Sequence, residues 1–317
     1  MNRFWTSAVM AVILLMSASV VIASDLNREL LDAALVGDYD VVEALLKEGA
    51  SPNARAQFGK SALMFATEGG NTDVVYLLYR NGADVNARSV AGCTALTYAA
   101  ENGEHDLLKF YLSKGAKTYP KTRSGWDALG IATRQGYNDI LATLIKFGAN
   151  VNSSDKDGIT ALMAAAENNN TAAIKMLLDA DADLFVRNKD GMSAMMLAVC
   201  KGNLNAVQLL IARGANVRAV DDEAATSLFC AAENGHTNVM GLLIKKGVDV
   251  NHQNVDGETA LFAGVYGKQA SSVRYLLEHG VDMQIKNKKG KTVYQLAKRR
   301  HLQDIVNLLE RAGKKGK

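Results

Sequence analysis

GADVNARSVAGCTALTYAAENG, residues 82–103, contains the pattern that decides the fold. A glycine, a loop, a second glycine, a threonine and an alanine-rich run return along the 317-residue chain in steps of 33. The first glycine recurs at Gly49, Gly82, Gly115, Gly148, Gly214, Gly247, Gly280 and Gly313, and Asp181 takes its missing place. The second recurs at Gly59, Gly92, Gly125, Gly158, Gly191, Gly257 and Gly290, and Ala224 fills its gap. Two series in one register indicate an internal repeat.

Each part of the pattern has a physical reason. Gly82 follows an amphipathic run, and helices commonly end on a residue in the left-handed region, which glycine enters without steric cost. Asp181 is expected to adopt the same conformation. Thr94 precedes the alanine-rich run and is expected to cap the first amides of a helix. The same place holds Ser61, Asp127, Thr160, Ser193, Thr226, Thr259 and Thr292.

An alanine in the middle of each first helix keeps that helix slim, so that neighbouring repeats can approach closely. These alanines are Ala66, Ala99, Ala132, Ala165, Ala198, Ala231 and Ala297. Gly264 interrupts the series and should cost about 1 kcal/mol relative to alanine. A unit of turn, helix, helix and loop cannot bury its own apolar face, whereas stacked units can. We therefore predict an all-α solenoid of paired antiparallel helices with hairpin-like loops.

The pattern resembles the ankyrin repeat over about residues 25–313. The motifs that carry the resemblance are Gly-x-Thr-Ala-Leu, Ala-Ala-x-x-Gly and Gly-Ala-Asp-Val-Asn, at a period of 33. One departure is systematic: alanine replaces the proline of the family's Thr-Pro-Leu-His, and Met64, Met163 and Met196 replace its histidine. We expect these methionines to pack as flexible apolar side chains.

Nine repeats are expected, at about 24–55, 56–88, 89–121, 122–154, 155–187, 188–220, 221–253, 254–286 and 287–313. The first helix is expected to start near Asn27 or Arg28, with Asp25 or Asn27 as its cap. Residues 314–317 are expected to form a frayed basic tail.

Residues 1–23 have the pattern of a secretory signal peptide, with Arg3, an apolar run and a small-residue site ending at Ala23. The open alternative is an uncleaved anchor helix, although residues 8–23 are short against the roughly 20 that span a bilayer. An ankyrin array behind such a leader looks most like an exported bacterial protein, periplasmic or secreted.

Three cysteines do not form a recognisable disulfide framework. Cys200 and Cys230 fall in neighbouring first helices about one turn apart in height. With helix axes about 10 Å apart, their α-carbons are expected to exceed the limit of roughly 7 Å for a disulfide.

No motif indicates an enzyme. The five histidines form no metal-binding spacing, and nucleophile-elbow and phosphate-loop patterns are missing from the sequence. His236 follows Gly235 and is expected to be structural. A net charge of +3 does not favour nucleic acid. We expect no catalytic residue, cofactor or metal.

The resemblance implies a scaffold or adaptor that binds a partner protein through a concave groove and the loop tips; we expect a monomer. Two alternatives stay open: a membrane-tethered structural protein that contacts anionic lipid through a basic C-terminal repeat, and a secreted effector that acts on a foreign protein.

The 33-residue register locates two series of expected groove residues. The loop-tip series is Lys60, Cys93, Trp126, Ile159, Met192, Ala225, Glu258 and Lys291. Its members Cys93, Trp126, Ile159 and Met192 are expected to form an exposed apolar stripe roughly 30 Å long. Alternatively, Trp126 folds down over its own turn.

The helix-end series is Glu68, Glu101, Arg134, Glu167, Cys200, Glu233, Tyr266 and Arg299, and Asn102 and Asn168 neighbour two of its members. Glu68, Glu101, Asn102, Arg134, Glu167, Asn168, Glu233 and Tyr266 are predicted to contact the partner. The mostly acidic character indicates a partner with basic or amide groups, or else a solvated polar face.

The last repeat is crowded with lysine and arginine. The cluster includes Lys286, Lys288, Lys289, Lys291, Lys298, Arg299, Arg300, Arg311, Lys314, Lys315 and Lys317. We expect a soluble cap on the array, with contact to anionic lipid or an acidic partner as the alternative.

Overall fold

The computed structural model describes residues 25–315, so the signal-peptide prediction for residues 1–23 lies outside the described residues. The chain divides into two compact units, Met1–Asn150 and Val151–Lys317. Every regular element among residues 25–315 is a helix, and β-pairing there is limited to isolated bridges at the loops. The prediction of an all-α repeat fold is confirmed.

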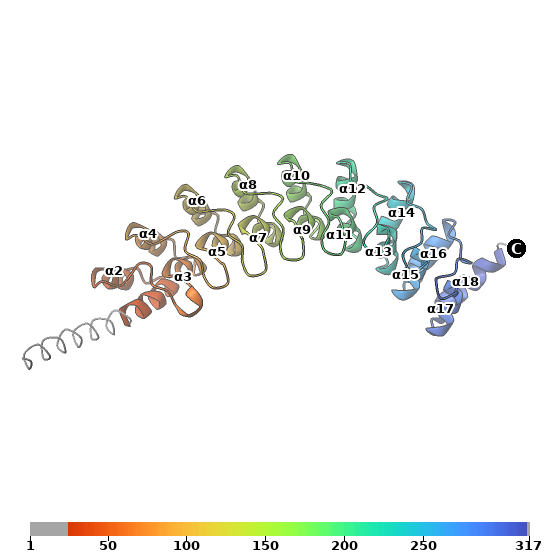
Figure 1. The fold of residues 1–317 in the computed structure, drawn as a ribbon, viewed down its shortest axis with the longest axis horizontal. Coiled ribbons are helices and arrows are strands. Elements are labelled where there is room, and N and C mark those ends of the chain that lie inside the picture. The colour runs from red at the N-terminus through yellow and green to blue at the C-terminus, as the bar shows by residue number, and fades with distance from the viewer. Residues whose placement is uncertain (1–24, 316–317) are drawn as a thin grey trace, which may run out of the picture. The chain divides into compact units, whose positions relative to one another are not determined.

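The first unit consists of helix pairs joined by tight turns (Figure 1). The second helices α4, α6 and α8 line one side of this unit, and α3, α5 and α7 lie with the loops on the other. Residues 25–36 are helical and precede α2. The elements that follow are α2 (Tyr39–Lys47), η1 (Gln57–Gly59), α3 (Ala62–Glu68), α4 (Thr72–Arg80), α5 (Ala95–Asn102), α6 (His105–Ser113), α7 (Ala128–Gln135) and α8 (Asn138–Lys146).

The second unit repeats this arrangement, with the loops again on the side of the first helices. Its first helices start at positions 33 residues apart, as the sequence register requires. Its helices are α9 (Ala161–Glu167), α10 (Thr171–Asp179), α11 (Ala194–Cys200), α12 (Leu204–Ala212), α13 (Ser227–Glu233), α14 (Thr237–Lys245), α15 (Ala260–Tyr266), α16 (Ala270–Glu278), α17 (Val293–Arg299) and α18 (Gln303–Lys315).

Most first helices begin at the predicted caps. The Thr94 hydroxyl accepts a hydrogen bond from Thr97 N at 3.2 Å, and Thr97 Oγ1 accepts one from Thr94 N at 2.8 Å. The Asp127 carboxylate accepts from Gly130 N at 2.9 Å. The prediction is wrong at Thr226 and Thr259, whose hydroxyls are buried without a hydrogen-bond partner among residues 25–315.

The turn prediction is confirmed at Asp181, where φ is 61°, and Ala224 adopts a similar φ of 58° in place of a glycine.

At the two ends of the array the predicted boundaries are wrong. Residue 25 is already helical, and the Asn27 side chain accepts from Ser51 N at 2.7 Å instead of capping a helix start. α18 runs through Gly313 to Lys315, so Lys314 and Lys315 continue a helix instead of starting a tail.

The three methionines that stand in the histidine position are core residues. Met64 and Met163 are 0% exposed and Met196 is 1% exposed. The expectation of methionine packing is confirmed. These side chains fill the space beneath the first helices with flexible apolar atoms.

Where the final asparagine of Gly-Ala-Asp-Val-Asn is present, it fastens its loop to the next repeat. Asn53 Nδ2 donates to Gly82 O at 2.9 Å, and its Oδ1 accepts from Asp84 N at 2.8 Å. Asn86 makes the equivalent bonds to the following loop, at 3.2 and 2.9 Å. Tyr119 and Phe185 occupy this place in two repeats, and their side chains are 65% and 67% exposed. The asparagine therefore acts between repeats, because the loop it binds belongs to the next unit.

The Gly264→Ala substitution should stabilise the protein. Gly264 is helical, and an added Cβ would lie 3.4 Å from Val273 Cγ2, an ordinary van der Waals distance. Alanine loses less backbone entropy in a helix, so we expect the free energy of unfolding to rise by about 0.5–1 kcal/mol. Urea denaturation followed by circular dichroism measures the change.

Gly267→Ala is the matched control, three residues away. A Cβ at Gly267 would lie 1.9 Å from Glu233 O, so that substitution should destabilise the same interface. Destabilisation by both variants would contradict the packing described for Gly264.

Candidate protein-binding surface

The loops place the loop-tip series next to the first helices. In each loop an amide four residues earlier donates to the carbonyl of the loop-tip residue, as Asp155 N does to Ile159 O at 3.0 Å. The Asp155 carboxylate accepts from Asp157 N and Ile159 N, both at 2.8 Å. Asn188, Asp221, Asn254 and Asn287 repeat this turn in the same register. The sequence analysis missed these residues, although their 33-residue spacing was visible.

A loop-tip residue and the helix-end residue eight positions later contact each other within one repeat. Lys60 forms an ion pair with Glu68. The Arg134 guanidinium lies 5.2 Å from the Trp126 ring centroid, and Tyr266 donates to Glu258 at 2.7 Å. The two series predicted separately therefore form one surface in these repeats.

Trp126 is not an exposed anchor. Its side chain is 6% exposed, and a Cβ at Gly130 would lie 2.2 Å from Trp126 Cε3. The ring folds over its own first helix because Gly130 leaves room for it, and Arg134 covers the outer face. The expected exposure of Trp126 is wrong, and the alternative reading of the sequence is confirmed.

The other three members of the predicted stripe, Cys93, Ile159 and Met192, are partly buried. Cys93 belongs with Trp126 to the first unit, and Ile159 and Met192 belong to the second. Their contact with a partner stays a prediction.

Half of the predicted acidic residues already have cationic partners. Glu68 pairs with Lys60, and Glu167 lies 3.1 Å from the Lys201 ammonium. Glu101 and Glu233 are exposed, and neither forms an ion pair with another described residue. The uncompensated negative charge is therefore concentrated at Glu101 and Glu233.

The predicted contact residues Asn102 and Asn168 lie beside the helix-end series, and their contact with a partner stays a prediction. Asn102 Nδ2 donates to Glu68 O in the preceding repeat at 3.2 Å. Asn168 is exposed at the end of α9. The Asn102 amide thus links two repeats, which leaves fewer of its donors for a partner.

Two tyrosines on this surface keep their protons. Burial, followed by the negative charges of Cys93, Glu68 and Glu101, raises the pKa of Tyr98 to about 12. Burial, and then the hydrogen bond to Glu258, raises the pKa of Tyr266 to about 12. Tyr266 therefore remains a hydrogen-bond donor to Glu258 at neutral pH.

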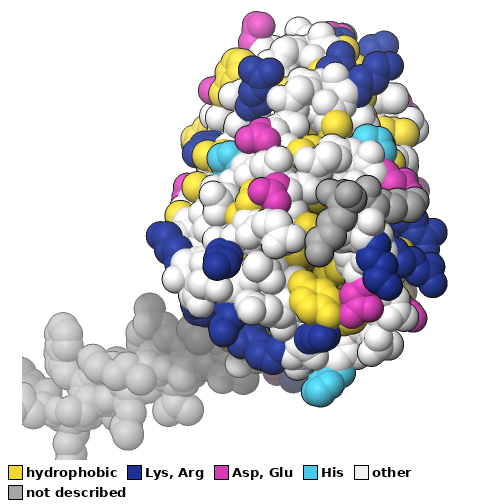
Figure 2. Space-filling model, turned by 90° about the vertical axis from the view of Figure 1, so that its right-hand side faces the viewer, with side chains coloured by type: hydrophobic (Ala, Val, Ile, Leu, Met, Phe, Trp, Pro, Cys, Tyr) yellow, Lys and Arg dark blue, Asp and Glu magenta, His cyan; other side chains and the backbone are white. Residues whose placement is uncertain are grey.

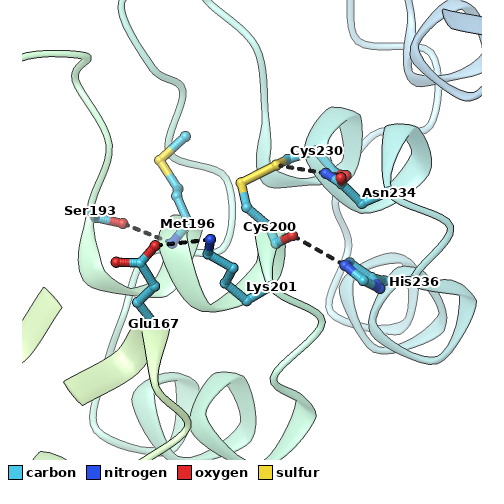
Figure 3. Close-up of a disulfide and its surroundings, with 8 residues drawn as sticks. All are labelled: Glu167, Ser193, Met196, Cys200, Lys201, Cys230, Asn234 and His236. Carbon is cyan, nitrogen blue, oxygen red and sulfur yellow. Dashed lines mark hydrogen bonds and ion pairs between the residues drawn. A yellow bond between two sulfur atoms is a disulfide. The ribbon is translucent and has the colours of Figure 1, made fainter. Parts of the chain in front are cut away.

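Cys200 and Cys230 form a disulfide, which corrects the sequence expectation (Figure 3). Their α-carbons lie 5.1 Å apart, because the end of α11 sits directly against the middle of α13. The general spacing of helix axes, about 10 Å, therefore overestimates the distance between these two α-carbons. Cys93 is the free cysteine of the described residues.

His236 supports the same junction, in the structural role that was expected. Its Nε2 lies 3.1 Å from Cys200 O, and Asn234 Nδ2 lies 3.5 Å from Cys230 Sγ (Figure 3). His236 directly precedes α14, but its imidazole does not cap that helix. The ring instead contacts the backbone at the end of α11.

Removal of the disulfide should destabilise the chain. The bond closes a loop with a sequence separation of 30 residues. The chain-entropy model gives a contribution of about 3–4 kcal/mol for such a loop. A Cys200→Ser/Cys230→Ser protein should lose about that much in urea denaturation, with Cys93→Ser as the matched control that changes little. Three reactive thiols in the unfolded, unreduced protein, instead of one, would contradict the disulfide.

The surface is hollowed where α11, α13 and α15 present their ends and loops. The cavity has a volume of about 310 Å³. Its wall includes Met192, Met196, the two disulfide-bonded cysteines, Glu233, Glu258 and Tyr266. The sequence analysis did not find it, because an empty volume leaves no motif.

The C-terminal end of the chain is rich in cations. Figure 2 faces this end and shows Lys and Arg side chains on its flanks, with carboxylates among them. Two of these cations contact aromatic rings: Lys298 Nζ lies 4.7 Å from the Tyr294 centroid, and the Arg300 guanidinium lies 4.7 Å from that of Tyr266. These contacts fit a cap whose outer face is polar.

Residues 25–315 contain no cluster of histidine, cysteine, aspartate or glutamate that could hold a metal ion. Within the same part of the chain, no helix is long and apolar enough to cross a membrane.

Comparison with known families agrees with this architecture. The profile described as ankyrin repeats (3 copies) matches residues 30–122, 99–188, 129–221, 180–254 and 228–316. These matches cover most of the chain, which belongs to the ankyrin repeat family. Comparison with curated proteins finds no match. Ankyrin repeats generally serve as protein–protein interaction modules and typically act as non-catalytic scaffolds.

Proposed function

We propose that the chain is a non-catalytic scaffold or adaptor that binds a partner protein through the loop tips and the ends of the first helices. The observation that carries this proposal is the contrast between constant and varied positions along the repeat. Turn glycines, capping hydroxyls and buried alanines recur almost unchanged, because packing requires them. The loop-tip and helix-end series vary freely among acidic, basic, aromatic, aliphatic and sulfur-containing residues.

The side chains of these two series differ between repeats while their backbone positions recur, so each repeat would favour a different chemical group of the partner. Glu101 is exposed at the end of α5, and Glu233 is exposed at the end of α13. Unpaired carboxylates of this kind favour a partner with basic or amide groups and steer its approach. The predicted contact residues Glu68 and Glu167 contribute less charge, since Lys60 and Lys201 offset them.

Photo-crosslinking in the source cell tests the proposal. A crosslinker at position 101, on the loop side of the first unit, should capture one protein. A crosslinker at Asp139, exposed in the first turn of α8 on the opposite side, should not. Equal capture at both positions, or capture at neither with an active probe, would contradict binding through this surface.

The proposal includes export of the chain, as a periplasmic or secreted protein. The leader-like residues 1–23 support export, and so does the Cys200–Cys230 disulfide, because disulfides persist chiefly in oxidising compartments. The N-terminal sequence of the protein from its source cell tests this directly, and should begin at Ser24. An intact N-terminus in the membrane fraction would instead establish a tethered protein.

A further inference from the structure

Near the start of the array, a lysine of the chain fills a site between two repeats. The Lys60 ammonium pairs with Glu68 and lies 4.3 Å from the Phe65 centroid and 4.6 Å from that of Tyr98. Its side chain is only 15% exposed, so the aliphatic stem is covered as well. The site combines a carboxylate for the charged head with an apolar wall for the stem, the arrangement that lysine side chains favour.

The same site recurs five repeats later without its lysine. At a distance of 165 residues, Ala225 replaces Lys60 and Glu233 corresponds to Glu68. Cys230 and Ala263 take the places of the two rings, Phe65 and Tyr98. All four of these residues line the 310 Å³ cavity. Short side chains at 225 and 263 leave a space that a lysine occupies in the earlier repeat.

The chemistry of the cavity matches a cationic side chain. Glu233 and Asp256 are exposed at the cavity and form no ion pair with any residue that the structure describes. Met192, Met196 and the disulfide supply apolar, polarizable surface for a stem.

The helix start at the wall of the cavity also differs between the two repeats. Thr226 lines the cavity and is 6% exposed, and its hydroxyl has no hydrogen-bond partner among residues 25–315. Ser61, at the corresponding place beside Lys60, caps its helix through Met64 N at 3.3 Å. In the repeat of the cavity, the Thr226 hydroxyl makes no such bond, so the helix start beside Ala225 is built differently from the one beside Lys60.

We propose that this cavity binds a lysine side chain presented by a partner protein, with the ammonium group beside Glu233 and the stem against Met192 and Met196. The inference rests on the proposed protein-binding function and names the chemistry of one contact. Arg300 does not fill the site itself, because its guanidinium stacks on the Tyr266 ring and donates to Tyr266 O at 3.5 Å.

Methyl NMR of the full-length protein with labelled methionine tests the proposal. The probe is acetyl-glycyl-lysyl-glycine amide, and its norleucine counterpart is the uncharged control. The lysine peptide should shift the Met192 and Met196 methyl signals, and the norleucine peptide should shift them far less. Glu233→Gln should lower the affinity for the lysine peptide by about fivefold, because the variant loses a partly exposed ion pair. Glu278→Gln, on the exposed face of α16, should have no effect.

Ala225→Lys is the decisive variant, since it supplies in this repeat the lysine that Lys60 supplies in the earlier one. The variant should keep the melting temperature of the parent protein and lose the response to the peptide. A retained response in Ala225→Lys, or equal shifts with norleucine, would overturn the inference. Equal shifts with calcium ions alone would also overturn it, because they would assign the site to a metal. Shifts that follow protein concentration in the absence of peptide would overturn it too, because they would assign the site to a second copy of the chain. Capture of a partner at position 101 alongside such a failure would leave the proposed function standing.

Discussion

The close approach of consecutive first helices is the constraint on which the rest of each unit depends. A Cβ at Gly267 would lie 1.9 Å from Glu233 O, and the α-carbons of Cys200 and Cys230 lie 5.1 Å apart. Only glycine, alanine and other thin side chains allow backbones to come this near. Helices of seven or eight residues are too short to be stable alone, so this contact between repeats supplies the stability that local propensity lacks.

The same constraint separates structural positions from those that are free to vary. Residues between the first helices must be small, and residues beneath them must be apolar, as Met64 and Met163 are. Most loop-tip and helix-end residues meet neither demand; Trp126, which is buried, and Cys200, which is disulfide-bonded, are exceptions. They interact chiefly with each other, as Lys60 does with Glu68 and Glu258 with Tyr266. The side chains at these positions can therefore vary while the fold is kept.

If the surface binds a partner as proposed, pairing between its own residues decides which groups remain unsatisfied for that partner. A lysine, a tryptophan or a glutamate at a loop tip reaches the helix end of its own repeat and occupies the local site. Ala225 is too short to do so, and the cavity beside Glu233 results. The groups left free for a partner are therefore found where a side chain is too short to reach its own helix end. Conspicuous residues such as Trp126 do not mark these places, because they pack within their own repeat.

The sequence by itself determined the repeat length, the helix pairs, most caps and the left-handed turn at Asp181, because each follows from local chemistry repeated in a fixed register. It also predicted, for the same reason, that the two candidate contact series lie at loops and at the ends of first helices. Tertiary structure alone decided the burial of Trp126, the Cys200–Cys230 bond, the ion pairs of Glu68 and Glu167, and the cavity. These depend on how closely and at what height neighbouring helices meet, to within a few ångströms. Side-chain size at every contact fixes that geometry jointly, so no single motif encodes it.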